Sequence, residues 1–183
     1  YSNLTEYDKA LTYMDKYFTS GGNEAEAYFL RAYIGSKTQK YEQRVQDMEK
    51  VAKDESLMEG ESGALAYMLW VEVLTAAGKY DYALNNPIFF GMTFFPQQRE
   101  MFEMYRAIIY EKKGDVATAD AIYEQLLKTK FADMIRSSYV MRTMTLLAQH
   151  NMDKAKETMD KFIKMTPKEK ASLIWEALWE DHM

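Results

Sequence analysis

The sequence contains no cysteine, and only two of its 183 residues are histidines. The absence of cysteine excludes a disulfide scaffold, a cysteine-ligated zinc site, an iron–sulfur cluster and thiol catalysis. The two histidines, His150 and His182, leave little for metal or triad chemistry. We therefore expect no metal and no cofactor.

An excess of basic charge is also missing. Lys and Arg number 23 and Asp and Glu number 28, which gives a net charge of −5. A protein that binds the phosphate backbone of nucleic acids needs a basic face, so the composition argues against a nucleic-acid partner. Acidic residues predominate within residues 1–92, which indicates either solvated helix faces or a field that steers a basic partner.

Catalytic and membrane-spanning motifs are absent as well. There is no phosphate-binding loop, no dinucleotide-binding glycine motif, no HExxH and no GxSxG, so we expect no enzymatic activity. No apolar run reaches the ~18 residues that a membrane span needs. Because the chain starts at Tyr1, we expect further sequence upstream of it. The compartment stays open, with the cytoplasm slightly favoured.

What the sequence does contain is helical periodicity along its length. Within residues 115–129, for example, apolar residues recur at the three- and four-residue spacings of one helix face. No strand is predicted. The expected helices cover residues 4–19, 23–37, 39–54, 57–77, 79–91, 97–113, 115–129, 132–150, 152–165 and 167–181.

These helices repeat. Ala83, Ala119 and Ala155 each follow a turn and are 36 residues apart. The preceding helices fall in the same register, since Tyr67 and Tyr139 are separated by two such periods. Each block is therefore predicted to contain a helix, a tight turn, a second helix and a short link.

This pattern resembles the tetratricopeptide repeat family. The residues that carry the resemblance are Gly78, Tyr80 and Ala83, then Gly114, Val116 and Ala119, and the block-ending prolines Pro96 and Pro167. The resemblance implies an all-α fold: a right-handed α-solenoid of antiparallel helix hairpins, with about ten helices in a single domain over residues 1–183. The hairpins are expected at residues 23–54, 57–92, 97–129 and 132–165, flanked by helices 4–19 and 167–181.

The chain departs from the family pattern at three points. Its period is near 36 residues, whereas the family's is about 34. Arg44 occupies an alanine position, and Pro87 lies inside a second helix, which it should kink or restart. A divergent tetratricopeptide-like array is the favoured interpretation, and another α-solenoid or a plain helical bundle are the alternatives.

The two flanking helices are expected to behave as ends of the array. Helix 4–19 matches a second helix without its partner, so part of its apolar face should be under-covered or covered by a second molecule. Helix 167–181 carries Trp175 and Trp179 and should cap the last hairpin by packing on residues such as Met159 and Phe162. Homo-association through these end helices, or a Trp-bearing helix reserved for a partner, are the alternatives.

In the tetratricopeptide family the first helix of each hairpin lines a concave groove where partners bind. The resemblance therefore implies a groove rich in methionine and aromatic residues. Its candidate residues are Phe29, Tyr33, Met68, Glu72, Met101, Met104, Tyr105, Ile108, Val140 and Met144. The same face includes Lys37, Thr75, Glu111, Ser137, Met141 and Leu147. Methionine adapts to varied apolar surfaces, so an amphipathic helix or an extended apolar peptide is the expected ligand.

Two further features allow two interpretations each. Arg31, Arg106 and Arg142 recur in one register position, where they either pair with nearby acids or form a ladder that holds acidic groups. The phenylalanines of residues 89–95 either pack under the Pro87 kink or form an exposed docking patch.

These observations lead to one functional hypothesis and two alternatives. The favoured hypothesis is a non-catalytic scaffold that binds a protein or peptide through its concave face. The first alternative is a sensing or effector module of a larger regulatory protein whose output domain lies outside this chain. The second is an enzyme with an unrecognised site.

Overall fold

The computed structural model describes residues 2–36, 38, 41–60 and 62–166, and every regular element in these ranges is helical. The all-α expectation is therefore confirmed. The chain forms two compact units, residues 1–120 and 121–183. The expected helix 167–181, with Trp175 and Trp179, lies outside the described residues.

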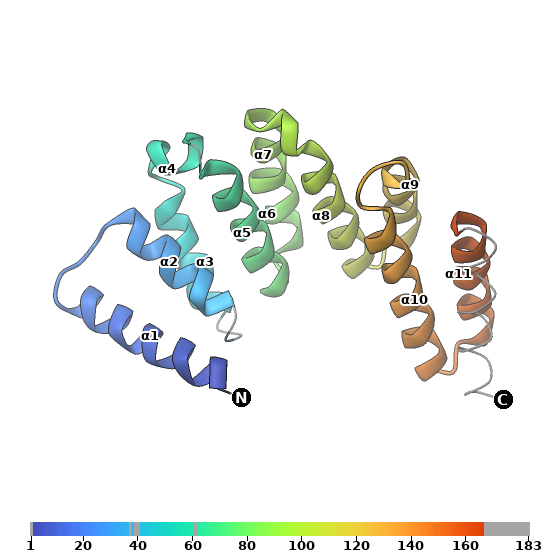
Figure 1. Cartoon of the computed structure of the whole chain (residues 1–183), viewed down its shortest axis with the longest axis horizontal. Helices are drawn as coiled ribbons and strands as arrows, with labels where there is room; N and C mark the ends of the chain where they lie inside the picture. Colours follow the sequence, from blue (N-terminus) through green and yellow to red (C-terminus); the bar gives the residue numbers. More distant parts are fainter. Residues whose placement is uncertain (1, 37, 39–40, 61, 167–183) are drawn as a thin grey trace. The chain divides into compact units, whose positions relative to one another are not determined.

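The first unit is a succession of packed helices (Figure 1). They are α1 (Ser2–Thr19), α2 (Ala25–Ser36), α3 (Tyr41–Val51), α4 (Glu55–Glu59), α5 (Gly63–Ala76), α6 (Tyr80–Ala83), a π-helix (Leu84–Ile88), α7 (Phe89–Phe94), a 3-10 turn (Pro96–Gln98) and α8 (Arg99–Lys112). Helix α9 (Val116–Leu126) crosses the limit between the units. The second unit continues with α10 (Ala132–Ala148) and α11 (Met152–Met165).

Three hairpin turns have the same backbone hydrogen bonds. The amides of Lys79, Asp115 and Asn151 each donate to the carbonyl five residues before, at 2.8 to 2.9 Å. The residue before each of these amides has a positive φ. It is glycine at 78 and 114, and it is His150 in the third turn. This left-handed helix ending favours glycine, so the structure gives His150 a role in the turn.

The alanines of the repeat register are fully buried. Ala83, Ala119 and Ala155 have no solvent-exposed surface, as the 36-residue spacing predicted. Their small side chains allow the second helix of a hairpin to approach its neighbours closely. The register deduced from the sequence is therefore confirmed at these three positions.

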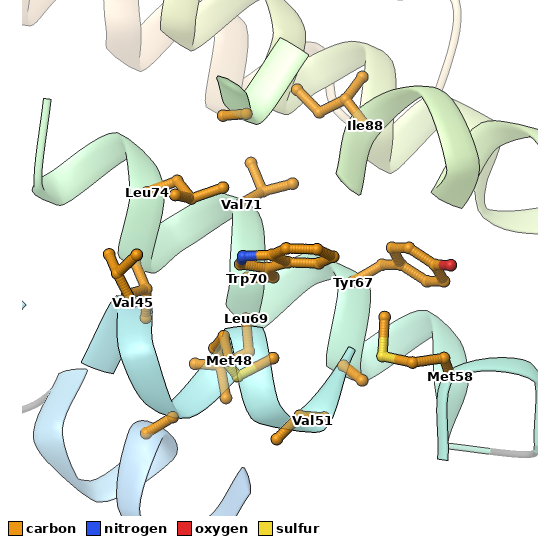
Figure 2. Close-up of a cluster of buried hydrophobic side chains, with 14 of the residues drawn as sticks. Val45, Met48, Val51, Met58, Tyr67, Leu69, Trp70, Val71, Leu74 and Ile88 are labelled. Atoms are coloured by element: carbon orange, nitrogen blue, oxygen red, sulfur yellow. The ribbon is translucent and has the colours of Figure 1, made fainter. Parts of the chain in front are cut away.

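Helix α5 lies in the middle of the core of the first unit. It packs against α2 and α3, and also against α6, α7 and α8, so most of its circumference is buried. Figure 2 shows Val45 and Met48 of α3 beside Leu69 and Trp70 of α5. Large apolar side chains that are fully buried stabilise the fold by about 1.5–3 kcal/mol each.

Two expected helices differ in detail from the prediction. The region 57–77 contains two helices, α4, which ends at Glu59 and which Asp54 caps through the amide of Leu57, and α5, which begins at Gly63. Pro87 does not end its helix, because a π-helix accommodates it. Proline lacks the amide hydrogen of the regular ladder, and the wider turn absorbs that loss.

Helix α1 packs on α2, and this contact covers only part of the surface of α1. Leu11 is buried, whereas Tyr7, Met14 and Phe18 remain partly exposed, which agrees with the expectation of an under-covered face. The ring of Phe18 stacks on Tyr28 of α2, with ring centres 4.4 Å apart. These contacts attach α1 to the first hairpin through one face only.

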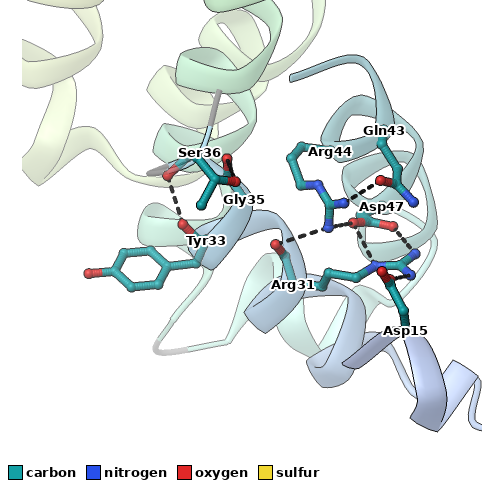
Figure 3. A network of polar contacts seen from close by, with 9 residues as sticks. Asp15, Arg31, Tyr33, Gly35, Ser36, Gln43, Arg44 and Asp47 are labelled. Carbon is teal, nitrogen blue, oxygen red and sulfur yellow. Dashed lines mark hydrogen bonds and ion pairs between the residues drawn. The ribbon is translucent and has the colours of Figure 1, made fainter. Parts of the chain in front are cut away.

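In the first hairpin, the small residue lies on the first helix, α2, and not on the second helix, α3. Arg44 of α3 stands where the other hairpins have alanine and is fully buried, while Gly35 of α2 lies against its side chain (Figure 3). A Cβ atom added to Gly35 would lie 2.1 Å from Cδ of Arg44. The absence of a side chain at Gly35 therefore makes room for the arginine.

A buried ion network satisfies the Arg44 guanidinium. It donates to Asp47 at 2.9 Å, to Gln43 at 2.6 Å and to the carbonyl of Arg31 at 3.2 Å. Arg31 donates through two nitrogens to the same Asp47 and through a third to Asp15 of α1 (Figure 3). Burial lowers the pKa of Arg44, and Asp47 opposes that effect. The network joins α1, α2 and α3.

We expect Ala119→Leu to lower the free energy of unfolding by about 1–3 kcal/mol, because added methylene groups overpack a site that is already full. Ala117 lies in the same helix but is exposed, so Ala117→Leu is the matched control and should change stability little. Chemical unfolding measures both. Equal effects of the two substitutions would contradict the register.

We expect Gly35→Ala to destabilise the chain by about 1–3 kcal/mol, because its new Cβ collides with Arg44. Adding Arg44→Ala to that variant should restore part of the loss, since Asp47 keeps its ion pair with Arg31. A double-mutant cycle by urea unfolding measures the coupling. If the two substitutions act additively, the proposed exchange of small and large residues is wrong.

Candidate functional site

The first helices of the hairpins in the first unit, α2, α5 and α8, pack side by side. The structure brings two of the predicted groove residues together across α5 and α8. The Tyr105 hydroxyl donates a hydrogen bond of 2.6 Å to the Glu72 carboxylate. This contact fixes the orientation of both side chains on that face.

The predicted residues of the first unit differ in exposure. Tyr33 and Glu72 are exposed, and five others are partly exposed: Phe29, Met68, Met101, Tyr105 and Ile108. Met104 is only 1% exposed, so its place in the predicted groove is wrong. Its helix turns that side chain into the core.

Sequence reasoning missed two exposed leucines on the same helices. Leu30 of α2 and Leu65 of α5 both present much of their side chain to solvent. Leu65 lies one helical turn before Met68, so extending the predicted stripe toward the start of α5 would have found it.

In the second unit, helix α10 exposes one continuous stripe. We call it the methionine seam; it consists of Met134, Ser137, Met141, Met144 and Ala148, all of them exposed. Met141 is 62% exposed. Val140 lies beside the seam and is partly buried, whereas Leu147 is buried, so the prediction that it faces the groove is wrong. Met134 was missed, although its spacing from Ser137 and Met141 indicates it.

The three recurrent arginines, Arg31, Arg106 and Arg142, contact side chains of their own helices or of neighbouring helices. Arg31 is paired with Asp15 and Asp47, and Arg106 with Glu103 at 3.2 Å. The guanidinium of Arg142 lies over the Tyr139 ring, 4.8 Å from its centre. These contacts favour internal pairing over a ladder that holds acidic groups.

The phenylalanines of residues 89–95 differ in exposure. Phe95 is partly buried and contacts Tyr67, with ring centres 6.0 Å apart. Phe89, Phe90 and Phe94 are exposed, so the first of the two interpretations, packing under the Pro87 kink, does not hold for these three rings. The local sequence left both orientations open, and the packing of α7 on α5 and α8 decides between them.

Other types of site find little support in the described part of the chain. Within it, no group of three His, Asp or Glu side chains is placed to hold a metal ion. None of its helices combines the length and the apolar character that a membrane crossing requires. A shallow surface hollow of about 480 Å³ lies beside Asn23, Tyr28 and Lys50.

Burial raises the pKa of the Tyr105 phenol, and its hydrogen bond to Glu72 and the charge of that carboxylate raise it further. The folded chain therefore keeps this proton at a pH where the unfolded chain loses it. We expect the stability of the folded state to fall as the pH rises above about 10, and to fall less in Tyr105→Phe. Urea unfolding across this range is the measurement. Tyr13→Phe, at an exposed tyrosine, is the control, and equal pH slopes in both variants would contradict the assignment.

Comparison with known proteins agrees with this geometry. The tetratricopeptide repeat family model matches residues 25–53, which contain α2 and α3. Repeats of this kind generally mediate protein–protein interactions. No curated protein sequence matches the chain significantly.

A crystal structure of a tetratricopeptide repeat protein from Parabacteroides merdae is similar, with a TM-score of 0.54 and 22% sequence identity. The match covers 95% of this chain and 65% of that chain, so this chain spans about two thirds of the length of that protein. At this identity the likeness concerns the fold. The chain therefore has an all-α fold like that of a tetratricopeptide repeat protein, and its residues 25–53 match the repeat itself.

Proposed function

We propose that this chain is a non-catalytic scaffold that binds a protein or peptide segment through the exposed faces of its first helices. The observation that carries the proposal is the methionine seam of α10. Exposed apolar side chains that form a continuous patch are typical of interaction surfaces, whereas scattered ones are not. The five residues of the seam are uncharged, and the exposed Asp133, which pairs with Arg136, lies at its N-terminal end.

The second helix of the same hairpin provides an internal comparison. The exposed residues of α11 are mostly charged: Asp153, Lys154, Lys156, Glu157, Asp160 and Lys164. Solvation alone would favour such side chains on both helices. The difference between α10 and α11 therefore supports a binding role for the face of α10.

The spacing of the seam favours a helical ligand. Its five residues follow one another at intervals of three and four, the pattern through which two helices pack along a shared line. Methionine side chains are flexible and polarisable, so they adapt to different apolar partners. An amphipathic helix fits this surface, and an extended apolar peptide is the second form of ligand.

The first unit offers a related surface on α2, α5 and α8. Leu30, Tyr33 and Leu65 are exposed there, and Met68 is partly exposed. Glu72 is held in place by Tyr105, so one acceptor group stands at a defined position among apolar ones. Apolar contacts would supply affinity on this face, and Glu72 would supply orientation.

The test uses a phage-displayed library of amphipathic helical peptides selected on the intact chain. We expect the enriched peptides to carry apolar residues along one face, and Met141→Glu to weaken their binding by at least about tenfold, since it places a charge in the seam. Met152→Glu is the matched control, because Met152 of α11 is 42% exposed in the same hairpin. Circular dichroism should show unchanged helicity in both variants.

Two outcomes would contradict the proposal. The first is an absence of enriched peptides. The second is equal binding to the parent chain, the Met141→Glu variant and the Tyr33→Glu variant, which would show that neither first-helix face takes part.

A further inference from the structure

The outer surface of the second hairpin carries four exposed aromatic rings. We call this group the aromatic ridge; it consists of Tyr82, Phe89, Phe90 and Phe94. Their exposed fractions are 43%, 55%, 39% and 46%. All four lie on the continuous helical stretch from α6 through the π-helix to α7, over about 18 Å of helix axis.

The other second helices show what this position normally holds. The corresponding outer face of α3 exposes Glu42, Gln43, Gln46, Glu49 and Lys50, and that of α11 is mostly charged. Helix α9 exposes Glu124 and Gln125 beside three small apolar side chains, Val116, Ala117 and Ala121, and no aromatic ring. Because the repeats share one architecture, the ridge cannot be ascribed to the fold. A surface of rings in contact with water needs another explanation.

The rings are held in place by one another and by the core below. Phe89 meets Phe90 edge to face at 5.4 Å, and Phe90 stacks on Phe94 at 6.1 Å. Phe94 in turn contacts Tyr67, which is buried in the core. Beneath them, Gly91 allows close contact with Phe102 of α8, since a Cβ at residue 91 would lie 2.4 Å from that ring. A partner would therefore meet rings that are already ordered, which lowers the entropic cost of binding.

Charge restricts the identity of the partner. Residues 82–98 contain no charged side chain, although 28% of the chain is charged. A charge brought against this surface would be desolvated without a pair, so the contacting face of the partner must be uncharged. No lysine or arginine in this stretch is available to hold anionic lipid headgroups. Two copies would each carry a net charge of −5, a long-range repulsion that salt screens and that only weakly disfavours a second copy.

We infer that the aromatic ridge is a second docking surface, which binds an amphipathic helix of another protein through that helix's apolar, uncharged face. A line of side chains along one helix is the form of contact that packs against a second helix. This surface is separate from the first-helix faces proposed above. It would give the scaffold two partners, or two contacts with one.

The experiment repeats the helical-peptide selection on the intact chain, this time with counter-selection against the double variant Phe89→Ser/Phe90→Ser. We expect enriched peptides with an uncharged apolar face, and at least about a tenfold loss of their affinity for the double variant. Tyr13→Ser is the matched control, because Tyr13 is 72% exposed on α1 and should not matter. Met141→Glu should also leave these peptides bound, which separates this surface from the methionine seam.

Four outcomes would overturn the inference. Peptides that bind the parent chain and the double variant equally would show that the ridge takes no part, and so would a failure to enrich any peptide. Sedimentation equilibrium that shows a dimer, lost in the double variant, would assign the ridge to a second copy. Flotation with phosphatidylcholine vesicles, lost in the same variant, would assign it to a lipid surface.

Discussion

The close approach of the two helices within each hairpin is the constraint on which the rest of the structure depends. Small side chains suit such an approach, and the alanines at positions 83, 119 and 155 are fully buried. The first hairpin differs, because Gly35 supplies the small residue and Arg44 fills the space. The exchange introduces a buried guanidinium, which then requires Asp47 and Arg31 as partners. A substitution in the helix contact thus leads to a polar network that also attaches α1.

Close packing within hairpins leaves each helix with one face for solvent or for partners, and the chain uses these faces unequally. The outer faces of α3 and α11 carry charges, as solvation favours. The methionine seam, on the first helix α10, and the aromatic ridge, on the second helix of its hairpin, carry no charge on these faces. Apolar surface that the fold does not require is the physical basis for both binding proposals. Their chemistry also differs, since the seam is flexible and the ridge consists of rings that contact one another.

Several features of the candidate surfaces could be predicted from the sequence, and particular residues show where prediction ended. Met101, Met104, Tyr105 and Ile108 recur at helical spacing, and three of them are at least partly exposed while Met104 is buried. Periodicity identifies a stripe but not its edge, because the edge depends on which helices pack from either side. The same limit explains the omission of Met134 and Leu65. For residues 89–95, neither spacing nor composition distinguishes an inward ring from an outward one.

The sequence by itself determined the helices, their turns and their repeat. These follow from local rules: helical spacing of apolar residues, glycine at the turns of residues 78 and 114, and a 36-residue interval between the alanines at 83, 119 and 155. Pro87 and the phenylalanines of residues 89–95 also indicated an unusual segment. Only the tertiary structure decided that Gly35 makes room for Arg44, that Tyr105 reaches Glu72, and that three phenylalanines of α7 face outward. Each of these depends on contacts between segments distant in the sequence, and the local pattern of either segment alone carries no information about them.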